Sequence, residues 1–262
     1  MERILAETGR AARDLLAFVG GVSRLAAALA FKLLKLARLN LRLFGKVALN
    51  QVRFSGVGAV PLVALVAAFI GGVAIIQSFN RLTGLAPDLI GTLLVTIIVR
   101  ELGPLITAVI LIGRSGTAIA AEIGSMRLNG EIEALKAYRI DPVDFVVLPR
   151  VLGMILAMFS LLVVFDLFGI LGGFGIAAML QDISFSLLES RVLSALTNAD
   201  IVFSVLKALL FGSAISILPS YFGLAMRKSP TELPQAVTKA VVASMACVVF
   251  LDGAIAAAFY LL

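Results

Sequence analysis

The sequence predicts an all-α polytopic membrane protein, and its composition gives the first reason. Of the 262 residues, 61% are hydrophobic and only 15% are charged, with a mean hydropathy of +1.08. A soluble domain of this composition would lack the polar surface needed to cover its core. Apolar stretches longer than the roughly 18–20 residues that cross a bilayer recur along the chain, without the alternation of barrel strands. We therefore expect an N-terminal interfacial amphipathic helix and five transmembrane helices.

The N-terminal region, residues 1–55, carries ten of the 22 basic residues. Six of them recur at spacings compatible with one broad helical face: Arg24, Lys32, Lys35, Arg38, Arg42 and Lys46. Apolar residues fill the rest, which is typical of a helix lying along an anionic leaflet. The alternative is a cleaved signal peptide, but the apolar block is short, acidic residues precede it and the basic stripe continues beyond any cleavage site.

Hydropathy and turn residues predict spans over 57–79, 89–112, 145–180, 201–221 and 235–262. Pro104 should bend the second span, because it removes a backbone hydrogen bond. Glycines at 71 and 72, and again from 169 to 175, predict close helix packing, either within the chain or between two copies. Between the second and third spans we expect a loop over 113–144 that holds short amphipathic helices, and a second loop over 181–200.

The distribution of Lys and Arg predicts the orientation. Eighteen of them lie in the N-terminal region, the 113–150 segment and the 221–239 segment, whereas the alternate loops hold only Arg81 and Arg191. The positive-inside rule therefore places the N-terminus in the cytoplasm and the C-terminus on the periplasmic side.

Five ionisable residues fall inside the apolar runs: Arg100, Glu101, Asp166, Lys207 and Asp252. Helical rise puts Lys207 and Asp252 at similar depth, so we expect them to form an ion pair, with Asp166 as a competing partner. Arg100 and Glu101 are neighbours about 100° apart on a helix, so one should face a cavity and the other a neighbouring helix. A polar site in a transport path and a structural tie between helices both remain open.

Several chemistries are excluded. The chain has no histidine and one cysteine, Cys247, so His-based triads, zinc motifs and intrachain disulfides are ruled out. The string Gly-Arg-Ser-Gly at 113–116 matches a motif of intramembrane proteases, yet no histidine base exists to activate the serine. The chain lacks a P-loop, so ATP-driven work requires another chain. We expect no catalytic residue, metal site or cofactor, and no binding of nucleic acid.

Four segments resemble a known family: RELGP at 100–104, GRSGTAIAAEIGSM at 113–126, EALKAYRIDP at 133–142 and LPR at 148–150. They are similar to the permease subunit of the MlaE (YrbE) family, the membrane component of lipid ABC transporters associated with MCE proteins. The resemblance covers about residues 50–262, so 56–262 is expected to form the permease domain.

The resemblance implies roles for particular residues. The second helix would border a cavity that holds a phospholipid, with Arg100 near the phosphate and Glu101 at the polar end. The apolar wall would come from Phe69, Ile75, Ile76 and Phe79. A coupling helix within about 113–145 would insert into the ATPase, with contacts from Glu131, Glu133, Leu135 and Tyr138.

The resemblance also implies the assembly: a homodimer beside two cytoplasmic ABC ATPase subunits in the bacterial inner membrane. Phospholipid would move between that membrane and a periplasmic MCE lipid carrier, in support of outer-membrane lipid asymmetry, and a small cytoplasmic regulatory subunit is a further partner. The competing class is a self-contained secondary transporter or ion channel. Such a protein is expected to contain internal repeats, and none is evident in this sequence. A structural scaffold is the third class. Purification with the neighbouring chains distinguishes the three.

Overall fold

The structure, a computed structural model, describes residues 2–34, 52–81, 92, 95–181, 190, 192–227 and 229–261. Every regular element within these ranges is a helix, of α, 3-10 or π type. In chain order they are α1 (Glu2–Leu34), η2 (Val52–Gly56), η3 (Val57–Ala59), α3 (Val60–Arg81), η4 (Val95–Leu102), α5 (Gly103–Leu111), η5 (Ile112–Gly116), α6 (Thr117–Leu128), α7 (Glu131–Ala137), η6 (Val143–Val147), α8 (Leu148–Gln181), α10 (Asn198–Ala225) and α11 (Glu232–Leu261).

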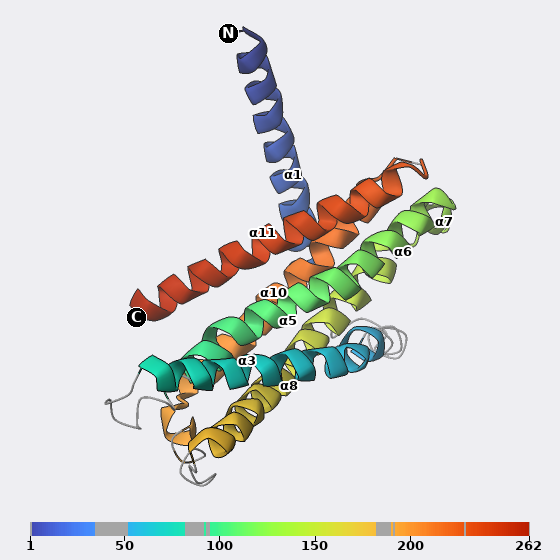
Figure 1. The fold of residues 1–262 in the computed structure, drawn as a ribbon. Coiled ribbons are helices and arrows are strands. Elements are labelled where there is room, and N and C mark those ends of the chain that lie inside the picture. The colour runs from blue at the N-terminus through green and yellow to red at the C-terminus, as the bar shows by residue number, and fades with distance from the viewer. Residues whose placement is uncertain are drawn as a thin grey trace.

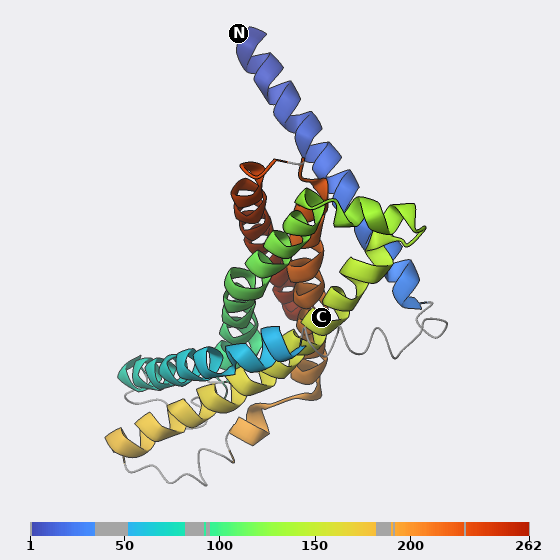
Figure 2. The same cartoon turned by 90° about the vertical axis from the view of Figure 1, so that its right-hand side faces the viewer.

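Five continuous helical runs in the described part of the chain are long and apolar enough to cross a membrane, which confirms the predicted fold class. They cover Val52–Gln77, Val95–Leu128, Val143–Ile176, Asn198–Ala225 and Glu232–Ala258. Figures 1 and 2 show these runs gathered in one bundle, with α3 beside α8 and α10 between α8 and α11. The chain is therefore an all-α multi-pass membrane protein.

The second span corrects the prediction of a loop from residue 113. The helix continues without a break from α5 through the π-helical η5 into α6, and ends only at Leu128. Residues 113–128 contain no proline, and their small side chains pack well: Ile119, Ala120, Ile123 and Gly124 are buried against neighbouring helices. The polar residues of this segment suggested a loop, although the helix accommodates them, with Ser115 buried and Glu122 exposed.

Helix α1 stands apart from the bundle. Its N-terminal half projects clear of the other helices in both views, while its C-terminal half packs against them (Figures 1 and 2). Exposed apolar and basic side chains share its surface, among them Leu16, Val19 and Arg24, as expected for an amphipathic helix. The predicted basic residues Lys35, Arg38, Arg42 and Lys46 lie outside the described residues.

A seam of glycines joins α3 to α8. A Cβ atom on Gly71 would lie 1.8 Å from the carbonyl oxygen of Gly169, and one on Gly172 would lie 2.3 Å from that of Ala68. Neither distance leaves room for a side chain, so the two backbones touch directly. The predicted small-residue face thus packs within the chain.

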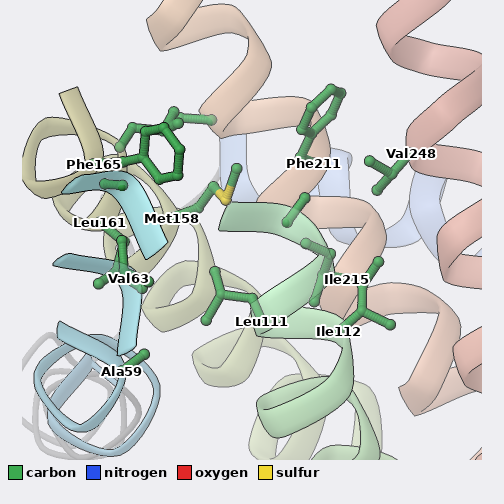
Figure 3. Close-up of a cluster of buried hydrophobic side chains, with 14 of the residues drawn as sticks. Ala59, Val63, Leu111, Ile112, Met158, Leu161, Phe165, Phe211, Ile215 and Val248 are labelled. Carbon is green, nitrogen blue, oxygen red and sulfur yellow. The ribbon is translucent and has the colours of Figure 1, made fainter. Parts of the chain in front are cut away.

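The apolar core lies where the spans converge (Figure 3). Leu111 and Ile112 of the second span meet Met158 and Phe165 of α8 and Phe211 of α10, all almost fully buried. The outward faces remain apolar and exposed, as Phe69, Val163 and Phe250 illustrate. A soluble protein rarely exposes so much apolar surface, but a bilayer covers it.

Candidate functional site

A network of charges lies between the second, fourth and fifth spans, and Lys207 of α10 is at its centre. The Lys207 Nζ atom lies 2.6 Å from Asp252 Oδ1 on α11 and 3.7 Å from Glu101 Oε2 on η4. The side chains of Lys207 and Asp252 are only 5% and 9% exposed. The two residues paired in the sequence analysis therefore lie in direct contact, deep within the protein, where each neutralises the charge of the other.

Lys207 also donates a hydrogen bond to a backbone carbonyl of the second span, next to Pro104. Pro104 has no backbone N–H, so it cannot donate to the carbonyl four residues earlier, which belongs to Arg100. Lys207 Nζ donates to that carbonyl oxygen at 2.5 Å. The preceding residues form the π-helical η4, a geometry that is common at functional sites. One ammonium group thus ties together the second, fourth and fifth spans.

Arg100 has a separate partner that the sequence analysis missed. Its Nε lies 2.5 Å from Asp200 Oδ1, and a terminal nitrogen donates to Asp200 Oδ2 at 3.2 Å. Asp200 is 1% exposed, and its Oδ2 also accepts hydrogen bonds from the backbone N–H and the hydroxyl of Thr197, each at 2.8 Å. Thr197 and Asp200 form a capping box at the start of α10. The pattern Thr-x-x-Asp before an apolar run was the signal that could have revealed it.

Asp166, predicted as a rival partner for Lys207, takes another position. Its Oδ1 faces Gly103 and would lie 3.2 Å from a Cβ atom there. No group in the described part of the chain donates a hydrogen bond to this oxygen. Lys207 is thus engaged by Asp252, Glu101 and the carbonyl of Arg100, and Asp166 takes no part in the network.

A small cavity of about 20 Å³, enough space for about one water molecule, lies beside the network. Its lining includes the charged residues Arg100, Glu101, Asp200 and Lys207 and the apolar residues Phe203 and Ile255. The side chains of Arg100 and Glu101 are 21% and 33% exposed, so they form its accessible polar edge. A single polar atom or a water molecule in this cavity would lie next to both charges.

Two apolar grooves flank the exposed face of α3. One, of about 270 Å³, lies between α3 and the second span and is lined by Phe69, Ile70, Val73, Ala74, Gln77, Ile97 and Leu102. The other, of about 400 Å³, lies between α3 and α8 and is lined by Ala68, Phe69, Gly72, Val73, Ile76, Gly172, Gly175, Ile176 and Met179. Phe69 and Val73 line both grooves, and Phe69 is 68% exposed. The two grooves therefore run on either side of one ridge.

The predicted wall residues divide between these places. Phe69 and Ile76 line the grooves, whereas Ile75 is fully buried in the core and faces neither of them. The side chain of Phe79 lies outside the described residues. Ile75 and Ile76 are about 100° apart on the helix, so they could not both face the same groove.

The short helix α7 occurs where the coupling helix was predicted. It is preceded by Gly130 at φ 77° and followed by Tyr138 and by Arg139 at φ 60°, so its ends are sharp turns. Ile132 is buried and Leu135 packs partly against the core, while Tyr138 is 80% exposed.

The acidic residues of α7 have neighbours at its first turn. Glu131 accepts a hydrogen bond from the side chain of Asn129 at 3.3 Å, and Glu133 pairs with Arg127 of α6 at 3.0 Å. Glu131 and Tyr138 are thus the predicted contact residues most accessible to a partner, whereas Leu135 is half-buried within the chain.

Comparison with known proteins identifies the family. Residues 48–258 match the family described as Permease MlaE. A probable ABC transporter permease of Rickettsia prowazekii is 33% identical over 197 residues, which cover 75% of this chain and 76% of that protein. The intermembrane phospholipid transport system permease protein MlaE of Haemophilus influenzae is 28% identical over 205 residues, 78% of each chain. The chloroplastic protein trigalactosyldiacylglycerol 1 of Arabidopsis thaliana is 29% identical over 218 residues, covering 81% of this chain and 61% of that one. The chain belongs to the MlaE permease family.

Proposed function

We propose that the chain is the permease subunit of an ABC transporter that moves phospholipid between the inner membrane and a periplasmic MCE lipid carrier. Two copies would form the permease, and a separate ATPase would supply the energy. In a cell with an outer membrane, this transport would support the lipid asymmetry of that membrane. The name of the Haemophilus relative supports the class of substrate.

One observation carries the proposal: the segment η4 borders a charged cavity on one side and an apolar groove on the other. Arg100 and Glu101 line the cavity, while Ile97 and Leu102 of the same segment line the groove. A phospholipid has the same two-part character, with a charged head group and long acyl chains. The head group would lie at the polar edge, and the acyl chains would follow the ridge of Phe69 and Val73.

The polar edge also limits what Arg100 can do. Its guanidinium already forms two contacts with Asp200, so a phosphate would meet a partly neutralised cation. With Lys207 and Asp252 included, the network holds two cations and three carboxylates. We therefore propose that the site orients the head group weakly and releases it, as a transporter must.

For energy input we propose α7, on the cytoplasmic face, as the helix that the ATPase contacts. The positive-inside distribution supports this face, and Glu131 and Tyr138 are exposed there. A short helix between two spans can pass a rigid-body displacement to both of them.

The lipid path is tested with Val73→Trp, which places a large side chain on the ridge between both grooves. Purified complex carrying this substitution should retain less phospholipid by mass spectrometry and should transfer lipid more slowly between vesicles. Val249→Trp is the matched control, because Val249 is 63% exposed on α11 and lines neither groove. Equal transport in the two variants would contradict the proposed path.

The coupling role is tested by reversing charge on α7. The double substitution Glu131→Lys and Glu133→Lys should reduce co-purification of the ATPase while the permease stays folded. Arg127→Ala is the control, because it breaks the Glu133 ion pair without adding positive charge to α7. Undiminished co-purification of the double variant would place the ATPase contact elsewhere.

A further inference from the structure

Helix α1 is docked on the bundle by an aromatic cluster near its middle. The ring of Phe18 stacks on Phe222 at 5.4 Å and meets the edge of Tyr221 at 5.6 Å. Gly21 makes room for this contact, since a Cβ atom there would lie 2.6 Å from the Tyr221 hydroxyl. Both aromatic partners belong to the last turns of α10, so α1 is fixed to the fourth span.

A second contact joins the C-terminal part of α1 to the start of the third span. Leu29 is 1% exposed and packs with Val147, Leu148 and Val151, at the junction of η6 and α8. Burying a leucine side chain contributes roughly 1.5–3 kcal/mol, so this contact adds to the docking that the aromatic cluster provides.

Beyond Leu29, Lys32 bridges two carboxylates of the segment that follows α7. Its Nζ lies 2.5 Å from Asp141 Oδ2 and 2.7 Å from Asp144 Oδ1. The other oxygen of Asp141 accepts the backbone N–H of Val143 at 2.9 Å. Lys32 therefore clamps the turn around Pro142, the turn through which α7 is connected to the third span.

The two ends of α7 are thus held by cations from other elements. At the first end, Arg127 pairs with Glu133 and also donates to the carbonyl of Met226, in the link between α10 and α11. At the second end, the backbone N–H of Ile140 donates to Leu135, and Lys32 holds Asp141 next to it. A displacement of α7 would reach the third span through a turn that α1 keeps from yielding.

We infer that α1 is a brace for the coupling helix, and that Lys32 is a positioning residue for the conversion of ATP hydrolysis into lipid movement. This inference rests on the proposed function of α7. A displacement is transmitted only where its attachment is fixed, and the turn at 138–144 is held from outside its own segment by the packing of Val143 in the Leu29 cluster and by the ion pairs of Asp141 and Asp144. Lys32 supplies the cation of these ion pairs from an element outside the five spans.

The exposure of the ion pairs distinguishes a positioning role of Lys32 from a role in folding. The Lys32 side chain is 25% exposed and those of Asp141 and Asp144 are 48% and 35% exposed, so the ion pairs contribute little to global stability. Removal of Lys32 should leave the bundle and Leu29 in place. The effect should instead appear as a lower amount of lipid moved per ATP hydrolysed.

The experiment uses the whole complex, with its ATPase, reconstituted in phospholipid vesicles. Lys32→Ala should lower the amount of lipid moved per ATP hydrolysed severalfold, with ATPase binding and melting temperature unchanged. Lys32→Arg should restore the ratio, because it keeps the charge. Arg24→Ala is the matched control, since Arg24 donates to the carbonyl of Gly20 in its own helix, and it should behave as wild type.

Several results would overturn the brace. These are a wild-type ratio in Lys32→Ala, the same loss in Arg24→Ala, or a loss of ATPase binding in Lys32→Ala, which would assign Lys32 to assembly. Failure of the proposed function looks different, because the wild-type complex would then lack an ATPase or move no phospholipid.

Discussion

Two groups of ion pairs among the described residues differ in burial. In the network around Lys207 the side chains of Asp200, Lys207 and Asp252 are 1–9% exposed. In the pairs at the α7 end, those of Glu122, Glu133 and Asp141 are 38–55% exposed. A surface pair contributes about 0–1 kcal/mol, whereas removing one partner of a buried pair costs about 3–5 kcal/mol. The buried network around Lys207 should therefore stabilise the packing of the spans. The exposed pairs near α7 should contribute little to stability and should instead influence the position of α7.

The largest expected effect is that of Lys207→Met, which leaves Asp252 without its cation and the carbonyl of Arg100 without its donor. We expect the free energy of unfolding to fall by about 3–5 kcal/mol. Denaturant unfolding of the purified protein in detergent measures it. The double variant Lys207→Met with Asp252→Asn should recover part of the loss, and a double variant less stable than the single one would refute the buried pair.

Asp200→Ala should come next, with a loss of roughly 1–3 kcal/mol, because Arg100 loses its carboxylate and α10 loses its capping box. Asp200→Asn keeps a capping oxygen but removes the charge, so its stability should lie between those of the wild type and Asp200→Ala. Asn198→Ala, an exposed change in the same turn, is the control and should be nearly neutral. The same unfolding assay ranks the three variants.

At the other region, Glu122→Gln removes the carboxylate that Arg150 contacts at 3.0 Å. The Glu122 side chain is 55% exposed, so the unfolding free energy should change by less than about 1 kcal/mol. A loss comparable to that of Lys207→Met would erase the distinction between the two regions.

The smallest effect is expected from pH. Burial raises the pKa of Asp141, but the hydrogen bonds from Lys32 and Val143 and the charges of Lys32 and Lys136 outweigh it, so the pKa lies below 3.8. Burial lowers the pKa of Lys32, but its bonds to Asp141 and Asp144 and their charges hold it above 10.5. Stabilisation from Asp141 is present above pH 3.8 and lost as pH falls through the folded pKa, and that from Lys32 is present below pH 10.5 and lost as pH rises through the folded pKa.

The contact of Lys32 with Asp141, at the C-terminal end of α1, should therefore be constant between these limits and should loosen only outside them, while the apolar contacts of Phe18 and Leu29 keep the rest of the helix docked. A nitroxide label on Ala30→Cys, in a Cys247→Ala background, should gain mobility only below the lower limit or above the upper one. The same label on Leu16→Cys, in the N-terminal half of α1, is the control and should not change. Increased mobility at Ala30 near neutral pH would contradict the assignment.

The sequence alone was sufficient to predict the five spans and the ion pair between Lys207 and Asp252. Five apolar runs were long enough to cross a membrane, and helical rise alone put Lys207 and Asp252 at the same depth. The structure has their charged atoms 2.6 Å apart. Both inferences use local regularity, which a single chain carries in its own spacing.

Other features depend on contacts between distant segments or on how a helix tolerates polar residues. Asp200 was assigned to a loop, because a capping residue lies at the border between two patterns. The segment 113–128 was assigned to a loop because of its polar side chains, although nothing in it ends a helix. The donation from Lys207 to the carbonyl of Arg100 requires a proline in one span to meet a lysine in another, which no spacing within either span reveals.

The direct backbone contact between α3 and α8 has a mechanical consequence. Helices separated by flexible side chains can slide as those side chains change rotamer, but Gly71 and Gly169 leave nothing between them to rearrange. Helices α3 and α8 should therefore move together, as one rigid body. In the proposed transporter, a movement that opens a path for lipid would therefore come from the other helices, which would shift relative to the α3–α8 pair.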